Sequence, residues 1–463
     1  MLDINNLKNK KVLVMGLGLH GGGVSVVKWL VKQGAQVTAT DLKIKKDLLP
    51  SLAKLKAFKV KYVLGRHNLE DFRKADLIVQ NPGVPANSQY LIAAKKAGVP
   101  IENEATLFFR RCPAPILAVT GTKGKSSLVS LLFHVLKSKF KDTVMAGNIR
   151  DVLMLDVLPK IKKNTKVILE LSSFQLEGLA GLKRSPHIAF FTNIMRDHLN
   201  RYGTMPVYIN AKLNMIKFQN SNDFAVLNAD NAYTRRFAKE TKAKVFWFSL
   251  NKKVSPGAYR EKNWLIFTDG HKKEKVLPLD KLDVLADYQR EQFLAGLIAG
   301  KLFGLSNGII FEGLKSYKGL HDRLEFIKEI NGIKYYNDTA ATMPEAAISA
   351  LKALGNSKRK NIVLLAGGAN KNLVFQGFCR HIVRYCKAVI LFKGQASLII
   401  AKQLGKKIKH EVVKSMEEAV GRAVKLSQKG DIVLLSPGAA SFGLFKHEFD
   451  RGEQFKKCVK QQK

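Results

Sequence analysis

The stretch Ala118-Val-Thr-Gly-Thr-Lys-Gly-Lys-Ser-Ser127 decides how the rest of this chain is interpreted. It overlaps an apolar run at 115–119 that predicts a buried strand, and it precedes an apolar helix predicted over 128–136. A glycine-rich turn between a strand and a helix points backbone N–H groups at one spot, where they bind polyphosphate oxygens. The sequence therefore predicts a nucleotide phosphate site made by Gly121, Thr122, Lys123, Gly124, Lys125, Ser126 and Ser127.

Within this loop, Lys125 is expected to neutralise the β- and γ-phosphates, and the Ser126 hydroxyl is expected to bind Mg²⁺. The spacing departs from the common G-x-x-x-x-G-K-[ST] pattern, whose first glycine would fall at Val119. The loop must therefore close with Gly121 instead. A glycine-lysine-serine turn can also be an ordinary strand-to-helix connection, but the order of strand, loop and helix favours the nucleotide site.

The length and composition of the chain limit the class of protein it can be. A chain of 463 residues is too long for one hydrophobic core and predicts about three domains. No apolar run reaches the roughly 18 residues of a membrane span, and the N-terminus lacks the apolar centre of a signal peptide, so we expect a cytoplasmic protein. The four cysteines contain no C-x-x-C pair, which disfavours a zinc site and a disulfide framework.

The net charge of +41 is unusual. Such a charge attracts nucleic acids, acidic membranes or polyanionic small substrates. The lysines are spread along the whole chain, however, without a basic helix interleaved with aromatic residues. We therefore interpret most of them as a solvated surface, and expect small-molecule substrates, no nucleic-acid partner and a monomer.

The N-terminal region predicts a β-turn-α-β unit of Rossmann type. A strand at 11–15 leads into the glycine-rich stretch 16–23, and a second strand ends at Asp41. A further strand at 76–80 runs into the turn Asn81-Pro-Gly-Val-Pro85. A lone G-x-G-x-x-G is weak evidence for a dinucleotide, so a nucleotide-sugar or no ligand at all stays possible here.

Short apolar strands recur along the rest of the chain. They are predicted at 166–170, 187–192 and 224–228, and again at 333–336, 361–365, 388–392 and 431–435. Two prolines near residues 113–115 and a new unit from about Gly319 suggest the boundaries. The prediction is an α/β fold with a Rossmann-like N-terminal domain, a central P-loop-type ATPase domain and a Rossmann-like C-terminal domain, at 1–112, 113–318 and 319–463.

Three polar clusters accompany the phosphate loop: 170–177, 192–202 and 208–216. Glu170 or His198 could hold Mg²⁺, because a cation that bridges phosphates takes few protein ligands. A surface histidine is an equally good interpretation of His198 from the residues alone. By composition alone, Lys212 is an exposed helix lysine.

The ordered set of motifs resembles the Mur ligases over essentially the whole chain. The motifs are Thr120-Gly-Thr-Lys-Gly-Lys-Ser126, Glu170-Leu-Ser-Ser-Phe-Gln-Leu-Glu177, Asp197-His198, Ala211-Lys212, Asn337-Asp338 and Leu435-Ser-Pro-Gly-Ala-Ala-Ser441. The second is the most specific, and within the family it is most similar to the members that add D-glutamate to UDP-N-acetylmuramoyl-L-alanine.

The resemblance implies an ATP-dependent amide ligase of cytoplasmic peptidoglycan precursor synthesis. The alanine carboxylate attacks the γ-phosphate to give an acyl phosphate, and the D-glutamate amine then displaces phosphate. Two Mg²⁺ ions are implied, served by Ser126, Glu170 and His198. The lysine that matches Lys212 is carbamylated in the family, which makes it a carboxylate-like metal ligand. Lys125, His198 and Lys212 are thus the implied catalytic residues.

The resemblance also implies the binding residues. The UDP-linked substrate would be held by Gly18, Asp41, Asn81, Gly83, Asn148 and Ser172. The D-glutamate carboxylates would be held by Thr342, Lys371 and Ser441, and a lysine with two hydroxyls suits a dicarboxylate. ATP would be contacted by Gln289, Gln292, Arg323 and Asp338, in addition to the phosphate loop.

This chain departs from the family pattern at several positions. A common lysine is replaced by Ala340, a usual histidine by Asp322, and an asparagine pair near the adenine by Gln289 and Gln292. No departure removes an implied metal ligand. The alternatives are another Mur ligase or a folylpolyglutamate synthase-like amide ligase, and, from a different class, a non-catalytic nucleotide-binding protein.

Overall fold

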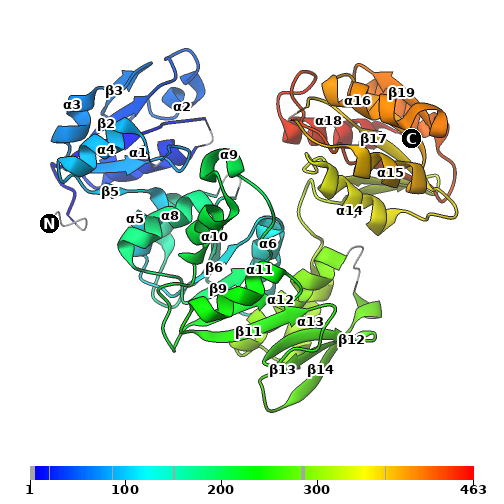
Figure 1. The fold of residues 1–463 in the computed structure, drawn as a ribbon, viewed down its shortest axis with the longest axis horizontal. Coiled ribbons are helices and arrows are strands. Elements are labelled where there is room, and N and C mark those ends of the chain that lie inside the picture. Colours follow the sequence, from blue (N-terminus) through cyan, green and yellow to red (C-terminus); the bar gives the residue numbers. More distant parts are fainter. Residues whose placement is uncertain are drawn as a thin grey trace. The chain divides into compact units, whose positions relative to one another are not determined.

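The computed structural model describes residues 6–19, 21–85, 87–149, 152–282, 287–370 and 372–462. The chain forms two compact units, Met1–Leu282 with Glu291–Tyr317, and Asp283–Arg290 with Lys318–Lys463. Three sheets with helices beside them give an α/β architecture, as the sequence predicts (Figure 1). The domain limits at 112 and 318 stay predictions.

The first sheet is parallel and has the order β3-β2-β1-β4-β5. Its strands are β1 (Lys11–Met15), β2 (Gln36–Asp41), β3 (Val60–Leu64), β4 (Leu77–Gln80) and β5 (Ile101–Glu102). Its helices are α1 (Gly22–Lys32), α2 (Leu49–Ala53), α3 (Leu69–Lys74), α4 (Gln89–Lys96) and α5 (Glu104–Arg111). Strand β1 lies at the centre of the strand order, so the glycine-rich stretch after it lies at the carboxyl edge of a Rossmann-like sheet.

The second sheet has nine strands in the order β14-β13-β12-β11-β10-β9-β6-β8-β7. The parallel part comprises β6 (Ile116–Thr120), β7 (Thr143–Gly147), β8 (Lys166–Glu170), β9 (Ile188–Phe191), β10 (Phe224–Asn228), β11 (Lys244–Ser249) and β12 (Gly257–Glu261). The antiparallel edge adds β13 (Trp264–Thr268) and β14 (Lys273–Pro278). These strands form antiparallel pairs with β12 and with each other at this edge of the sheet.

The helices of this unit include the one that follows the phosphate loop. They are α6 (Lys125–Lys137), α7 (Met154–Val157), α8 (Ser173–Leu182), α9 (Leu199–Tyr202), α10 (Met205–Leu213), α11 (Ala232–Arg236), α12 (Asp287–Leu302) and α13 (Asn307–Ser316). Short 3-10 turns lie at Leu158–Lys160, Phe237–Glu240 and Leu279–Lys281. Helix α12 begins in one compact unit and continues in the other.

The third sheet has the order β15-β16-β20-β17-β18-β19, and only β15 runs antiparallel to its neighbour. Its strands are β15 (Glu325–Ile330), β16 (Ile333–Asn337), β17 (Ile362–Ala366), β18 (Cys386–Phe392), β19 (Lys409–Val413) and β20 (Ile432–Leu435). Its helices are α14 (Pro344–Leu354), α15 (Gln376–Tyr385), α16 (Gln395–Leu404), α17 (Met416–Leu426) and α18 (Glu448–Gln461), with a 3-10 turn at Gly405–Lys407.

The central strands of all three sheets consist of continuous apolar runs, because helices cover both faces of these strands. In β6, every residue is buried, and so is every residue of β17. Polar residues then begin where such strands end, which places the loops 121–124, 171–172 and 192–198 at one edge of the second sheet.

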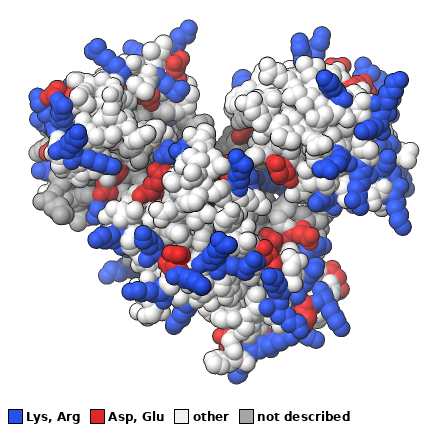
Figure 2. Space-filling model, viewed as in Figure 1, with Lys and Arg blue, Asp and Glu red and all other residues white. Residues whose placement is uncertain are grey.

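The surface carries the excess positive charge. Lys and Arg side chains are distributed over the visible face in Figure 2, with fewer acidic side chains between them. Within the described part of the chain, no helix is both long enough and apolar enough to cross a membrane.

Candidate active site

The loop between β6 and α6 is shaped by two glycines. Gly121 has φ 148° and Gly124 has φ 82°. A Cβ on Gly121 would lie 2.0 Å from Thr192 Oγ1, so only glycine fits at this position. The irregular position of the first glycine, noted in the sequence, is therefore a consequence of how closely this loop approaches the segment after β9.

That segment holds the loop by several hydrogen bonds. Thr122 N donates to Asn193 O (2.8 Å), and Lys123 N donates to Asn193 Oδ1 (3.0 Å). Thr122 Oγ1 accepts from Met195 N (2.9 Å) and is 3.1 Å from Tyr208 OH. Thr122, predicted as a phosphate contact, thus has its hydroxyl engaged in fixing the loop.

Lys125 is the first residue of α6 and folds back over the loop. Its Nζ donates to Gly121 O (3.1 Å) and Thr122 O (3.0 Å). Ser126 and Ser127 follow it in the first turn of the helix. A cation and a helix N-terminus at the same loop make an environment that favours phosphate oxygens.

Glu170 ends β8, beside β6 in the sheet, with Val119 as its register partner. The residue is 1% exposed, and its Oε1 accepts from Asn148 Nδ2 (3.1 Å). Its Oε2 is buried and has no hydrogen-bond partner. A buried carboxylate oxygen without a partner is unfavourable and is well satisfied by a cation, so this group fits a Mg²⁺ ion.

Lys212, on α10, is 2% exposed, so the composition-based prediction of an exposed helix lysine is wrong. Its Nζ donates to Gly121 O (2.9 Å) and Thr120 Oγ1 (3.3 Å), at the start of the phosphate loop. Burial, followed by the charge of Lys125, lowers the pKa of Lys212 well below its ordinary value. The amine is therefore held in an environment that favours its neutral form.

His198 precedes α9 and has φ 54°. Its ring centroid lies 4.9 Å from that of Phe174 and 6.2 Å from that of Tyr208, and its side chain is 45% exposed. Burial lowers the pKa of His198, Asp197 opposes this, and the charges of Lys125 and Lys212 lower it further. No group of three or more His, Cys, Asp and Glu side chains suited to a metal occurs in the described ranges.

The residues predicted to hold the UDP-linked substrate lie in three places. Gly18 N donates to Asp41 Oδ2 (3.0 Å), and Asn81 Oδ1 accepts from Gly83 N (3.0 Å). A Cβ on Gly16 would lie 2.9 Å from Asn81 Cβ, so the 81–84 turn lies directly against the glycine-rich stretch. Asn148 instead contacts Glu170, at the phosphate loop.

Ser172 has a local structural role, because its side chain accepts from Gln175 N and caps α8. Gln292 is buried, and its Nε2 lies 3.4 Å from where a Cβ of Gly124 would be. Gln289 belongs to the other compact unit. The structure therefore brings Gln292 to the phosphate loop.

In the second unit, the predicted residues gather near the ends of β16 and β20. Asp338 accepts from Ser436 Oγ (2.7 Å) and Leu324 N (3.2 Å), next to Arg323. Gly438 N donates to Ala341 O (2.8 Å), which joins the loop that contains Thr342 to the 436–441 loop.

The Ser441 hydroxyl, at the end of that loop, is buried without a hydrogen-bond partner. Ala369 pairs with Ala440, directly before Ser441. Lys371 itself lies outside the described residues.

Asp338 gives a prediction for stability. Burial raises the pKa of Asp338 to about 7, from an unfolded value of 3.8. Between about pH 4 and 7 the folded protein keeps a proton that the unfolded chain releases, so this group lowers the free energy of unfolding as pH rises, by about 4 kcal/mol in total. We expect Asp338→Asn to lack that loss in urea unfolding measured at pH 4.5, 6 and 8.

The exposed Asp47→Asn variant is the control for this experiment, and its pH dependence should match that of the unmodified protein. Parallel curves for Asp338→Asn and the unmodified protein would contradict the assignment.

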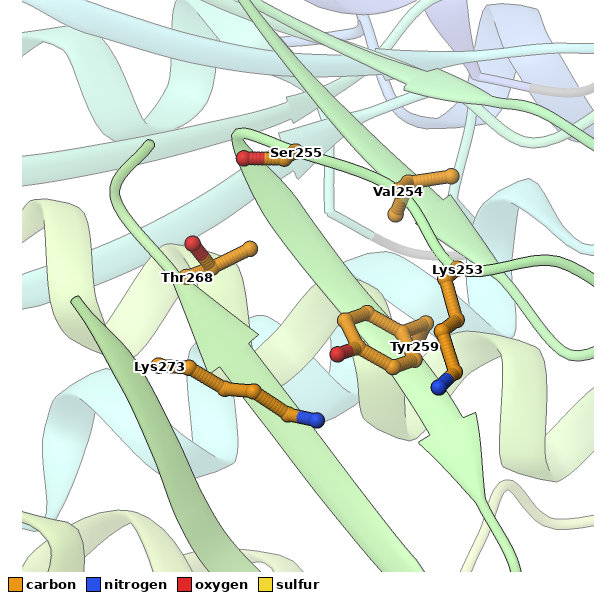
Figure 3. A pocket seen from close by; sticks show the side chains of 6 residues that line it. All are labelled: Lys253, Val254, Ser255, Tyr259, Thr268 and Lys273. Carbon is orange, nitrogen blue, oxygen red and sulfur yellow. The ribbon is translucent and has the colours of Figure 1, made fainter. Parts of the chain in front are cut away.

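A cavity of about 220 Å³ lies away from these residues in the sequence, at the antiparallel edge of the second sheet. It is lined by Lys253, Val254, Ser255, Tyr259, Thr268 and Lys273 (Figure 3). Both lysines pair with the single carboxylate of Glu261, at 2.7 and 2.9 Å. None of the lining residues belongs to the predicted nucleotide site, so we assign no nucleotide to this cavity.

Sequence reasoning missed the residues that support the loop. Thr192, Asn193 and Tyr208 lie inside the polar clusters, but nothing in their spacing predicted which loop they contact. The signal that was present is the position of Thr192 and Asn193 directly after a buried strand, where ligand-binding loops of a parallel sheet begin.

Comparisons with known proteins agree along the whole chain. Three family models match: "Mur ligase MurD-like, N-terminal domain" at 10–103, "Mur ligase middle domain" at 119–286 and "Mur ligase, glutamate ligase domain" at 322–438. A protein of Roseiflexus sp. named UDP-N-acetylmuramoylalanine–D-glutamate ligase is 43% identical, over 98% of this chain and 99% of that protein. The chain belongs to the Mur ligase family.

Solved structures of Mur ligases share the fold. The UDP-N-acetylmuramate-alanine ligase MurC of Thermotoga maritima is 18% identical, with a TM-score of 0.63 over 98% of this chain and 100% of that one. The MurF ligase of the same organism, solved in complex with ADP, is 17% identical, with a TM-score of 0.58 over 100% of both chains. The three-domain Mur ligase fold implied by the motifs is thus confirmed.

Mur ligases are ATP-dependent enzymes that form amide bonds, and this chain is an enzyme of that class. The alternative of a non-catalytic nucleotide-binding protein is therefore set aside. In this Mur ligase the phosphate loop, Glu170 and Lys212 occupy one edge of the central sheet.

Proposed function

We propose that this Mur ligase adds D-glutamate to UDP-N-acetylmuramoyl-L-alanine with ATP, in cytoplasmic synthesis of peptidoglycan precursors and as a monomer. The single observation that carries the proposal is the end-to-end match to the Roseiflexus relative that bears this name. The ADP bound to the Thermotoga MurF supports ATP as the phosphoryl donor. Two Mg²⁺ ions and a carbamylated Lys212 are part of the proposal.

The proposed reaction has two steps. A carboxylate oxygen of the alanine attacks the γ-phosphorus and releases ADP, which leaves an acyl phosphate. The amine of D-glutamate then attacks the activated carbonyl, phosphate departs, and the amine proton is lost to solvent. Two anions meet in the first step, so their repulsion must be reduced.

This chain supplies that neutralisation at the phosphate loop. Lys125 Nζ, held over the loop carbonyls, is placed to bind β- and γ-phosphate oxygens. Ser126, Glu170 and His198 would hold the Mg²⁺ ions, which when bound supply positive charge to the phosphates. The partnerless oxygen of Glu170 is the structural support for this assignment.

Lys212 fits the proposed carbamate chemistry. A neutral amine adds to CO₂ and releases a proton, which gives a carbamate with the charge of a carboxylate. The burial of Lys212 favours the neutral amine that this addition needs. Its Nζ already lies within hydrogen-bond distance of Gly121 O, next to the loop that would bind the phosphates.

The remaining proposed contacts come from several parts of the chain. Gly18, Asp41, Asn81, Gly83, Asn148 and Ser172 would hold the UDP-linked substrate. Thr342, Lys371 and Ser441 would hold the D-glutamate carboxylates, and Gln289, Gln292, Arg323 and Asp338 would contact ATP. The buried, partnerless hydroxyl of Ser441 supports a ligand contact there.

The test is an amino-acid specificity assay. Purified protein with ATP, Mg²⁺ and UDP-N-acetylmuramoyl-L-alanine is expected to release phosphate with D-glutamate, and the mass of the product should rise by one glutamyl residue. L-Glutamate, L-lysine and diaminopimelate serve as controls and should give background phosphate release. Turnover with L-lysine or diaminopimelate, but not with D-glutamate, would assign the chain to another branch of the Mur ligases.

A further inference from the structure

Arg201 makes long-range contacts that no proposed role above uses. It lies on α9, three residues after His198, and its side chain is only 14% exposed. Its Nη1 donates to Pro82 O (2.9 Å), and its Nη2 donates to Val84 O (3.2 Å). The guanidinium therefore bonds two carbonyls of a turn that is more than 110 residues away in the sequence.

The guanidinium group is itself held in place by Glu177 and Phe174. Nη2 also donates to Glu177 Oε2 (3.0 Å), and the guanidinium carbon lies 4.3 Å from the centre of the Phe174 ring. Tyr202 OH donates to the other carboxylate oxygen of Glu177 (2.6 Å). A planar cation stacked on a ring and paired with a held carboxylate has little freedom, so the direction of its N–H groups is set before any ligand binds.

Each end of this arrangement adjoins a part of the proposed site. The 81–84 turn packs against the glycine-rich stretch through Asn81 and Gly16. At the other end, His198 O accepts from Arg201 N (3.0 Å), and the Phe174 ring contacts the His198 ring. Arg201 thus directly links the turn proposed to hold the UDP-linked substrate and the segment proposed to hold a metal.

We propose that Arg201 is a positioning residue that ties the 81–84 turn to the His198 segment and so places the UDP-linked substrate relative to the phosphate loop. The substrate part of this inference rests on the proposed function. Lysine cannot replace it fully, because one ammonium group lacks the planar fork that reaches two carbonyls and a carboxylate together. Glu177 acts through Arg201, by holding the fork in place.

The link itself is tested without any substrate. We expect Arg201→Ala to raise amide hydrogen exchange at least tenfold in peptides covering the 81–85 turn, since two anchoring hydrogen bonds are lost. Glu177→Gln should raise it less, because the arginine remains. The control is Arg235→Ala, whose guanidinium donates to the nearby Ala229 O (2.9 Å), and exchange of the turn should then be unchanged.

The positioning role is tested by steady-state kinetics of the same variants. Arg201→Ala should raise KM for UDP-N-acetylmuramoyl-L-alanine about tenfold or more, the loss expected for charged hydrogen bonds, while KM for ATP stays within about twofold. Arg201→Lys should fall between Arg201→Ala and the unmodified enzyme. A merely structural role would lower the active fraction, and so kcat, without this selective change in KM.

The outcomes separate the two proposals. Unchanged hydrogen exchange in Arg201→Ala, or an equal rise in KM for both substrates, would overturn the positioning role. An unmodified enzyme that is inactive on UDP-N-acetylmuramoyl-L-alanine would overturn the proposed function, and the exchange experiment would then still decide whether Arg201 holds the turn. Thermal unfolding of each variant shows that the comparison is made on folded protein.

Discussion

Lys125→Ala is expected to lower kcat at least about a thousandfold, the largest effect among the substitutions considered for this enzyme. The ammonium group of Lys125 lies over Gly121 O and Thr122 O, in the turn whose backbone would surround the phosphates. Its charge would oppose the negative charge that builds up on the γ-phosphate as the carboxylate attacks. Phosphate release with saturating substrates measures the loss.

The matched control is Lys137→Ala, in the last turn of the helix that begins at Lys125. Lys137 is exposed and lies 4.8 Å from the centre of the Phe133 ring, so it contributes a solvent-screened charge and its removal should change kcat less than about fivefold. Full activity of Lys125→Ala would contradict the phosphate assignment. So would equal losses for the two variants, because a general effect of lost positive charge would then explain both.

Lys212→Ala is expected to lower kcat about a hundredfold or more, because the proposed carbamate ligand is lost. The enzyme should still fold, since the substitution removes a buried amine that is unfavourable to bury. Added acetate or another short-chain carboxylate should restore part of the activity by filling the space with a carboxylate. The control is Lys217→Ala, at an exposed lysine that follows the end of α10. Its kcat should stay near that of the unmodified enzyme without added carboxylate.

A spectroscopic experiment tests the modification independently of activity. With ¹³C-labelled bicarbonate, the unmodified enzyme should show a carbamate carbon resonance that is absent in Lys212→Ala and present in Lys217→Ala. No such resonance, together with no rescue by carboxylates, would remove the carbamate from the mechanism. The hydrogen bonds of Lys212 to Gly121 O and Thr120 Oγ1 would then define it as a loop-supporting residue.

Much of the fold was predictable because its signals are local. The strand predicted at 11–15 is β1 as observed, and the apolar run before the phosphate loop is β6. A short apolar run followed by glycines specifies a buried strand and a tight turn without help from distant residues. The motifs also specified the family, since they recur in a fixed order along the chain.

The site was predictable only in part. Glu170 could be placed at a strand end, but its partnerless oxygen and its contact with Asn148 could not, because both depend on how β7 and β8 lie beside each other. Gln289 and Gln292 lie three residues apart on α12, and their shared contact with ATP stays a prediction.

The sequence by itself therefore predicted the buried strand and glycine turn around 121–127, because these depend on residues close together in the chain. It also identified membership in the Mur ligase family, through motifs in a fixed order along the chain. Only the tertiary structure decided that Lys212 is buried against the loop and that Arg201 reaches the 81–84 turn. The physical reason is that burial and long-range hydrogen bonds are set by which surfaces pack together. The residue type alone does not specify whether a lysine such as Lys212 is exposed or buried.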